Sequence, residues 1–232
     1  MKQLVLDIGL ATGPTLASFF PGANQAVLRH LELCTSDSSA QVDATAQPSY
    51  LWGESGSGKT HLLQAVREAL REQGCRTGWL DAHTVQPMAF DERWVAVLMD
   101  DVHLFSPAQQ ALAFNWIINA MSPASGSPRW VLAAGETPPA DLPLRDDLRT
   151  RLGWGHVFQL HLLDEPERRA VLRKEAQERG IALGDDVVDF MLKRFSRDLG
   201  SLMQLLDHLD SFALRTQRAI TIPLLKTMLE SE

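Results

Sequence analysis

Cysteine is scarce in this sequence. The two cysteines, Cys34 and Cys75, stand in unrelated contexts, with no CxxC pair and no cluster of cysteine and histidine spaced for a metal. This excludes a disulfide framework and predicts reduced thiols, as in a cytosolic protein. No apolar run approaches the roughly 20 residues of a membrane span, and the first residues lack the basic region and apolar core of a signal peptide. We expect a cytoplasmic protein with no membrane partner.

Positive charge is also in short supply. The chain has 22 Lys and Arg against 29 Asp and Glu, a formal net charge of −7 at pH 7. It therefore carries no overall positive field that would draw it to nucleic acid, and any contact with DNA has to be local or pass through a partner. Hydrophobic residues, in contrast, make up 45% of the 232 residues, which is ample for a packed core.

Strand-like and helix-like segments alternate through the first two thirds of the chain. Runs such as WVAVLM and WVLAA are apolar throughout, as expected for parallel strands that are buried on both faces. The alternation predicts an α/β domain with a mostly parallel sheet and helices on both sides. A further helix is expected between Gly22 and Leu33, and the polar stretch 35–48 has the composition of a loop. The predicted strands are 50–52, 76–80, 94–99 and 130–134, and the predicted helices that alternate with them are 61–73 and 107–121.

The character of the sequence changes after residue 164. Strand-like runs stop, and leucines in the segment 199–217 recur at steps of three and four residues, as one buried helix face requires. The remaining predicted helices are 167–179, 185–195 and 222–229. We therefore divide the chain into a tail (1–12), an α/β nucleotide-binding domain (13–163) and a small all-helical domain (164–232).

The segment GESGSGKT matches the pattern G-x-x-x-x-G-K-[ST] between an apolar strand and an amphipathic helix. Its glycines let backbone N–H groups turn inward around phosphate oxygens at the positive end of the helix. Lys59 is predicted to reach the β- and γ-phosphates of ADP or ATP, and Thr60 to supply a hydroxyl to Mg²⁺. A chance Gly/Ser turn is the weaker alternative. The predicted nucleotide-binding residues are Gly53, Glu54, Ser55, Gly56, Ser57, Gly58, Lys59, Thr60 and His61, the last of which is expected to pack on the helix rather than to act as a base.

Two carboxylates end the buried strand 94–99. Next to a phosphate loop, Asp100 is placed to hold Mg²⁺, directly or through water, and Asp101 to orient an attacking water. The alternative is structural, since Asp101 could simply cap the following turn. The complete phosphate loop about 40 residues upstream favours the functional interpretation.

These motifs carry a family resemblance. GESGSGKTHLL, LMDDVHLF, VLAAGETPP and LRTRLGWGHVFQL, in this order and spacing, resemble the AAA+ domain of the bacterial replication initiator DnaA, from about Leu16 onward. The chain ends after the helical segment, with no DNA-reading domain, and in this and in details such as TRLGWGHVFQL it is similar to the Hda family, the regulatory inactivators of DnaA. The resemblance implies an AAA+ P-loop NTPase fold whose helical domain is a lid.

The resemblance gives meaning to Arg151, which falls where the family places its arginine finger. A guanidinium presented to a neighbour's γ-phosphate neutralises charge in the transition state, an effect of about 10³–10⁵ in rate. The alternative is a surface ion pair with Asp146 or Asp147.

The tail gains a meaning in the same way. Gln3, Leu4, Leu6 and Ile8 look like the peptide by which bacterial proteins bind the sliding clamp of DNA polymerase III, with apolar side chains for a groove and a glutamine for a directional hydrogen bond. Without the resemblance, an edge strand is the better interpretation.

Two positions depart from the family pattern. Glu136 stands where the initiator has a sensor aspartate, which predicts a longer or displaced contact to the γ-phosphate. The sensor arginine of the lid aligns with Gly200, while Arg197 lies one turn earlier. Binding of nucleotide is therefore expected, and hydrolysis by the chain itself is in doubt.

Three functions remain open on this evidence. The first is a regulator that is tethered to the clamp, and so to DNA, and that offers Arg151 to ATP held by DnaA. The second is an autonomous ATPase, such as a helicase loader, that uses Asp100 and Asp101. The third is an adaptor that binds ADP without catalysis. A homo-oligomer, most simply a dimer, is also expected from the AAA+ resemblance.

Overall fold

A computed structural model describes residues 13–36, 47–85, 88–123, 126–195 and 199–230. Five strands form one sheet in the order β2-β3-β4-β1-β5, and all four pairings are parallel. The predicted α/β class with a parallel sheet is thus confirmed. The strands are β1 (Ser49–Trp52), β2 (Arg76–Leu80), β3 (Trp94–Met99), β4 (Trp130–Gly135) and β5 (His156–Gln159).

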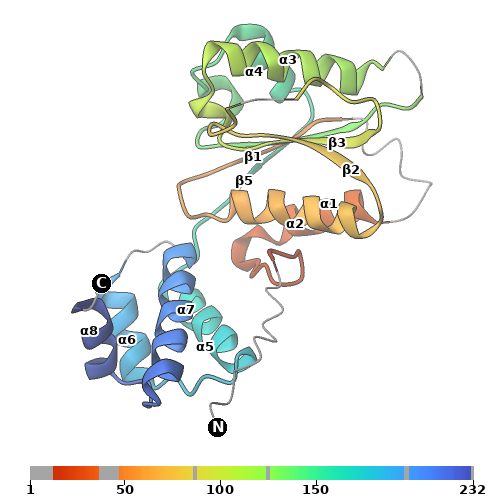
Figure 1. The fold of residues 1–232 in the computed structure, drawn as a ribbon. Helices are drawn as coiled ribbons and strands as arrows, with labels where there is room; N and C mark the ends of the chain where they lie inside the picture. The colour runs from red at the N-terminus through yellow and green to blue at the C-terminus, as the bar shows by residue number, and fades with distance from the viewer. Residues whose placement is uncertain (1–12, 37–46, 86–87, 124–125, 196–198, 231–232) are drawn as a thin grey trace.

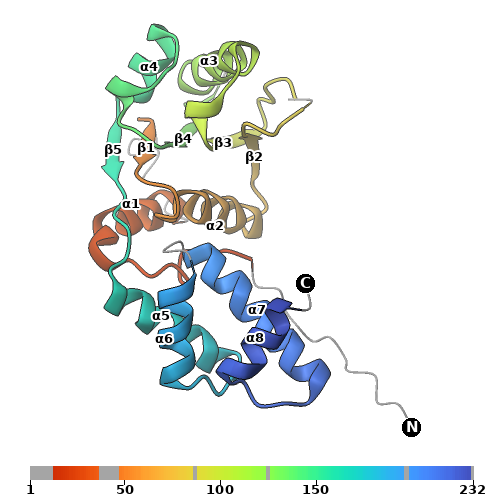
Figure 2. The ribbon, with the colours of Figure 1, turned by 90° about the vertical axis from the view of Figure 1, so that its left-hand side faces the viewer.

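Helices cover both faces of this sheet, as Figures 1 and 2 show. Helices α3 and α4 lie on one face and α1 and α2 on the other, and each face has its own buried cluster, one including Trp116 and Leu148 and the other Leu31 and Leu63. The apolar strands that the sequence predicted are therefore covered by helices on both faces of the sheet. The helices of this domain are α1 (Gln25–Thr35), α2 (Lys59–Glu72), α3 (Pro107–Met121) and α4 (Asp146–Leu152), with short 3₁₀ turns at Gly22–Asn24, Val102–Leu104 and Pro139–Asp141.

The register places the ends of the central strands side by side. Trp52 at the end of β1 pairs with Gly135 of β4 and with Gln159 of β5. Because parallel strands end at the same edge of a sheet, the segments that follow β1, β3 and β4 meet there. This edge is where the phosphate loop, the two aspartates and Glu136 leave the sheet.

The sequence patterns missed two elements, β5 and α4. Three of the four residues of β5 are exposed, since β5 is an edge strand beside β1, so it has neither an apolar run nor a clean alternation. Helix α4 has seven residues, too few to show a helical period. Both elements take their places from neighbours rather than from a pattern of their own.

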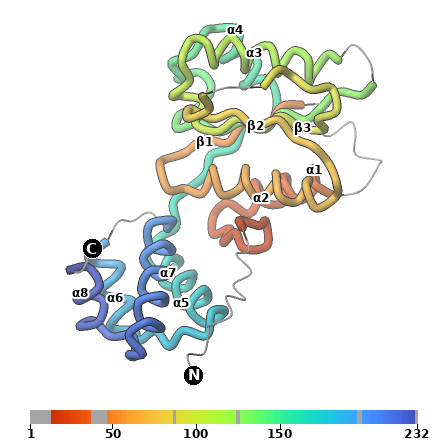
Figure 3. The backbone as a smooth tube through the Cα atoms, in the orientation of Figure 1, coloured from red at the N-terminus to blue at the C-terminus, as the bar shows by residue number. Residues whose placement is uncertain are grey.

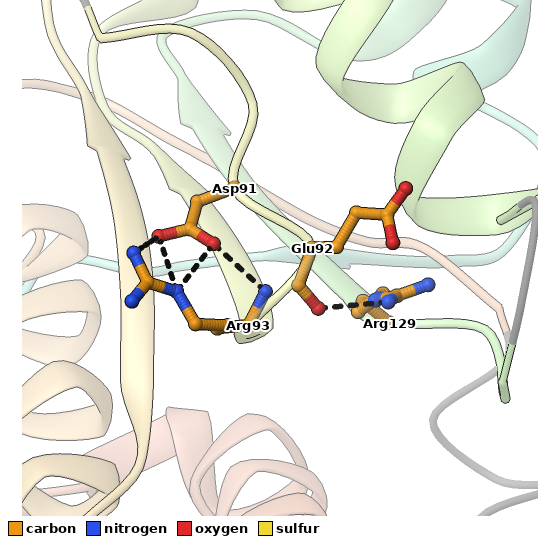
Figure 4. A network of polar contacts seen from close by, with 4 residues as sticks. All are labelled: Asp91, Glu92, Arg93 and Arg129. Atoms are coloured by element: carbon orange, nitrogen blue, oxygen red, sulfur yellow. Dashed lines mark hydrogen bonds and ion pairs between the residues drawn. The ribbon is translucent and has the colours of Figure 1, made fainter.

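A polar turn leads the chain into β3 (Figure 4). The Arg93 side chain donates to both carboxylate oxygens of Asp91, with Nη2 to Oδ2 at 2.7 Å. The hydrogen bonds of Arg93 hold the pKa of Asp91 low, at about 2. Arg129, just before β4, donates to the carbonyl of Glu92 at 2.8 Å, so the turn joins the starts of two adjacent strands.

The last third of the described chain is all helical, as the spacing predicted (Figure 3). Its core includes Leu172, Val188, Leu206 and Leu225, all of which are fully buried. Asp164 caps the first of these helices, since its side chain accepts from the N–H of Glu167 at 2.8 Å. The helices are α5 (Glu165–Glu178), α6 (Asp185–Arg194), α7 (Leu199–Thr216) and α8 (Ile222–Glu230).

Gly155 is required where α4 turns into β5. A Cβ at this position would lie 1.9 Å from the backbone carbonyl oxygen of Pro48, and a backbone atom cannot give way as a flexible side chain can. We expect Gly155→Ala to lower the free energy of unfolding by about 3 kcal/mol, as measured by urea denaturation. Gly153→Ala is the matched control, because its Cβ would meet neighbours at an ordinary 3.4 Å or more; equal loss in both variants would contradict the prediction.

Candidate nucleotide-binding site

The phosphate loop adopts the geometry that the glycines predicted. Gly56 and Gly58 have φ values of 80° and 96°, in the left-handed region that favours glycine. The loop leads directly into α2, whose first N–H groups have no partner within the helix. Ser57 Oγ is buried and makes no hydrogen bond within the described part of the chain, and its residue lines the cavity below. A cradle of this kind fits a polyphosphate.

Lys59 lies over the loop rather than in solvent. Its Nζ donates to the carbonyl of Gly53 at 2.7 Å and to that of Glu54 at 2.9 Å, and the residue is 7% exposed. Burial lowers the pKa of the ammonium, and the carboxylates of Asp101, Asp100 and Glu136 oppose this shift. A phosphate beside Lys59 would favour the charged form further.

Asp100 and Thr60 meet at the end of β3. Asp100 is 4% exposed. Burial raises the pKa of its carboxyl group, a side-chain hydrogen bond with Thr60 lowers it, and the adjacent Asp101 raises it. Among the described residues no group of three or more His, Cys, Asp or Glu could hold a metal. The pair fits Mg²⁺, which binds in such sites through one or two protein ligands together with phosphates and water.

Asp101 has a strained backbone, with φ 49° and ψ 43°, which costs a non-glycine residue energy. It precedes the 3₁₀ turn Val102–Leu104, yet its side chain makes no capping hydrogen bond. The alternative that Asp101 is a simple cap is therefore wrong. The residue instead lines the cavity at the phosphate loop.

Glu136 leaves the end of β4 toward the same place. Its Oε2 lies 3.6 Å from Nε2 of His103, and both residues line the cavity. His103 Nδ1 is buried without a hydrogen-bond partner in the described residues. The carboxylate at the sensor position is thus paired with an imidazole, which the sequence patterns did not suggest.

The phosphate loop opens into a cavity of about 840 Å³ between the α/β domain and the helical domain. This volume lies within the usual range for sites that bind small molecules and cofactors. The segment before α1 forms one wall of the cavity, and His61 of α2 contacts this segment. Its Nε2 lies 3.2 Å from the carbonyl oxygen of Thr15, and its ring packs at 5.7 Å from that of Phe19. Burial lowers the pKa of His61, and the hydrogen bond to Thr15 opposes the shift.

The lid brings two arginines to the cavity that the sequence motifs had not singled out. Arg168 lies in α5, and Arg179, which follows α5, lies 3.4 Å from Glu175 and 3.2 Å from Asp207. Gly200 also lines the cavity. The position that aligns with the sensor arginine of the family therefore lies at the site, but its residue carries no positive charge. Arg197 is outside the described residues. The predicted helix places both arginines on one segment after Asp164, but no motif of the sequence pointed to them.

Arg151 does not line this cavity. It lies in α4, before β5, whereas the phosphate loop follows β1. Since β1 and β5 run parallel and in register, the two sites lie at opposite ends of the same pair of strands, and a four-residue strand rises about 13 Å. Figure 2 shows α4 at one end of β5 and the start of the helical domain beyond the other. The sequence prediction for the tail, at Gln3, Leu4, Leu6 and Ile8, falls outside the described residues.

A parallel sheet with helices on both faces, a phosphate loop at its carboxyl edge and a helical lid over that loop define an AAA+ protein. The model of the bacterial DnaA ATPase domain matches residues 10–159, and the model of the Hda lid domain matches residues 164–229. The chain belongs to the bacterial DnaA ATPase-domain family, as an Hda-like homologue of DnaA.

Individual proteins are similar to this chain over most of its length. An uncharacterized protein of Haemophilus influenzae is 32% identical over 238 residues, which cover 98% of each chain. Domain III of the replication initiation protein DnaA from Thermotoga maritima superposes with a TM-score of 0.72 at 20% identity, over 94% of this chain and 95% of that one. AMPPCP-bound DnaA from Aquifex aeolicus has a TM-score of 0.65 at 19% identity, over 85% of this chain and 65% of that one. At these identities the two structures show the fold alone.

Among the described residues, each helix is too short or too polar to span a lipid bilayer.

Proposed function

We propose that this protein is a negative regulator of replication initiation. It binds an adenine nucleotide with Mg²⁺, is tethered through its tail to the sliding clamp on DNA, and presents Arg151 to ATP held by DnaA. Hydrolysis of that ATP converts the initiator to its ADP form. The family relationship and the Hda-type lid support DnaA as the partner.

The observation that carries the proposal is the place of Arg151. The guanidinium lies at the opposite end of the β1–β5 pair from the chain's own phosphate loop and outside the cavity at that loop. Asp146 and Asp147 pair instead with Arg149 and Arg145, at 2.6 and 2.7 Å, so the alternative of an ion pair with Arg151 has no support here. An arginine placed in this way does not reach the chain's own nucleotide, which supports a role on the nucleotide of another molecule.

The nucleotide of this chain would have a structural part in this scheme. The loop amides and Lys59 would hold the phosphates, Thr60 and Asp100 would hold Mg²⁺, and the lid would close the other side of the site. Carboxylates outnumber cations in the cavity lining, which makes Mg²⁺ necessary to offset their repulsion of a polyphosphate. The charged lining residues are Asp101, Glu136, Glu175, Glu178 and Asp207 against Lys59, Arg168 and Arg179.

Autonomous ATP hydrolysis is the second candidate, and one observation favours it. Asp101 lines the cavity from a strained backbone, as a residue that orients an attacking water would. Gly200 at the lid argues against rapid turnover, since it offers no charge to the γ-phosphate. Robust turnover by the isolated chain that is lost on Asp101→Asn would establish this second function.

The direct experiment is the hydrolysis of DnaA-bound ATP in the presence of clamp-loaded DNA, with and without this protein. We expect strong stimulation that depends on both the clamp and this protein. Absence of stimulation, with nucleotide binding intact, would reject the proposal. A resting homo-oligomer could cover Arg151, so the protein concentration should be varied over the range in which its oligomeric state changes.

The tail provides a separate prediction. Deletion of residues 1–9 should abolish binding to the clamp, because Gln3, Leu4, Leu6 and Ile8 are removed, and should leave the melting temperature of the chain unchanged. Surface plasmon resonance on immobilised clamp measures the first effect and calorimetry the second. Binding that persists after the deletion would show that the resemblance of the tail to a clamp peptide is accidental.

A further inference from the structure

We infer that Trp154 is a positioning residue for Arg151, holding the guanidinium ready for a phosphate in another molecule; the functional part of this inference rests on the proposed function. Arg151 Cζ lies over the indole ring of Trp154, 4.3 Å from the ring centroid. This is the shortest cation–aromatic distance among the described residues, the others being 5.2–5.9 Å.

Stacking leaves the guanidinium in a form suited to a phosphate. The contact with the indole is made through Cζ, at the centre of the group, whereas the N–H donors of arginine point outward in its plane. An ion pair with a neighbouring carboxylate would occupy those in-plane donors. Because Asp146 and Asp147 are engaged by Arg149 and Arg145, the donor edge of Arg151 is not claimed by either acid.

Trp154 itself is exposed, which a packing role does not explain. The residue is 60% exposed although its side chain is a large aromatic. An aromatic face holds a cation weakly at an exposed site and more strongly when a partner excludes water. The stack would therefore tighten when the surface meets another molecule.

The backbone around this stack is held firmly. The N–H of Trp154 donates to the carbonyl of Arg151 at 3.3 Å, and that of Gly153 donates to the carbonyl of Arg149 at 3.2 Å. On the other side, the N–H of His156 donates to the carbonyl of Pro48 at 2.9 Å, where Gly155 allows the close approach. The pair Arg151–Trp154 thus lies between the hydrogen-bonded end of α4 and the start of β5, which pairs with β1.

The test compares variants in the assay of DnaA-bound ATP hydrolysis. We expect Trp154→Ala to lower the maximal stimulated rate by about 3- to 30-fold, with the half-saturating protein concentration unchanged, and Trp154→Phe to stay within about threefold of the parent. Val157→Ala is the control, because it removes apolar surface from the same edge, 40% exposed, without touching the stack; its maximal rate should equal the parent's.

Other results would overturn the inference. A Trp154→Ala variant with an unchanged maximal rate but a raised half-saturating concentration would make Trp154 a contact for the partner instead. A fully active variant, with Arg151→Ala inactive, would refute the positioning role while the proposed function survives.

A readout without a partner separates the two failures. The Nε–H resonance of Arg151 in the isolated, nucleotide-bound protein should carry the ring-current shift of a guanidinium over an indole, and Trp154→Ala should remove it. If that shift is absent in the parent protein, the inference fails whatever DnaA does. If the shift is present but the parent protein does not stimulate hydrolysis, only the proposed function fails.

Discussion

Replacement of Arg151 by alanine is expected to reduce the stimulated hydrolysis of DnaA-bound ATP by about 10³-fold or more. As the γ-phosphoryl group leaves, negative charge spreads over its oxygens, and a guanidinium supplied from a second molecule offsets that charge without any reorganisation of solvent. Alanine removes this interaction in the transition state and leaves the surrounding surface in place.

The structure offers a matched control for this substitution. Arg149 lies on the same helix two residues earlier, and its guanidinium is held by Asp146 at 2.6 Å, so Arg149→Ala should leave the stimulated rate within about threefold of the parent. Nucleotide affinity should be the same in both variants, because neither residue lines the cavity. Stimulation by Arg151→Ala equal to that by the parent would remove the arginine-finger mechanism.

Replacement of Lys59 by alanine should weaken nucleotide binding by about 100-fold. Lys59 is the cation at the loop itself, and the carboxylates of Asp100, Asp101 and Glu136 all act on it. Without the ammonium these carboxylates would face the phosphates with no cation of the loop itself to compensate them. Isothermal titration calorimetry with ADP and ATP at fixed Mg²⁺ measures the loss.

The control for Lys59 lies on the same helix. The guanidinium of Arg67 lies over the ring of Trp79 at 5.3 Å and does not line the cavity, so Arg67→Ala should bind nucleotide like the parent. Circular dichroism should show that Lys59→Ala is folded, since the substitution leaves the carbonyls of Gly53 and Glu54 without this donor. Full affinity in a folded Lys59→Ala variant would contradict the assignment of the loop.

Much of the fold could be read from local patterns. Strands such as β3 and β4 are buried on both faces and appear in the sequence as apolar runs. The main helices are long enough for their period to appear in the chain. The loop Gly53–Thr60 was recognisable for a related reason: its backbone needs glycine at fixed positions, and its lysine and threonine are dictated by the chemistry of a phosphate. Helix α4 and strand β5 had no such signal, because one is short and the other lies exposed at an edge.

The sequence by itself determined the phosphate loop, the parallel α/β class and the all-helical character of the last segment, because each depends on spacing along the chain. Only the tertiary structure decided which side chains share a site. It brought Arg168 and Arg179 to the cavity, paired Glu136 with His103, and put Arg151 over Trp154 at the opposite end of the β1–β5 pair from the phosphate loop. The physical reason is that some of these contacts join residues that are far apart in the chain. Others join near neighbours whose side chains are brought together by a backbone that is anchored to the sheet. Neither kind of contact produces a periodic pattern in the sequence.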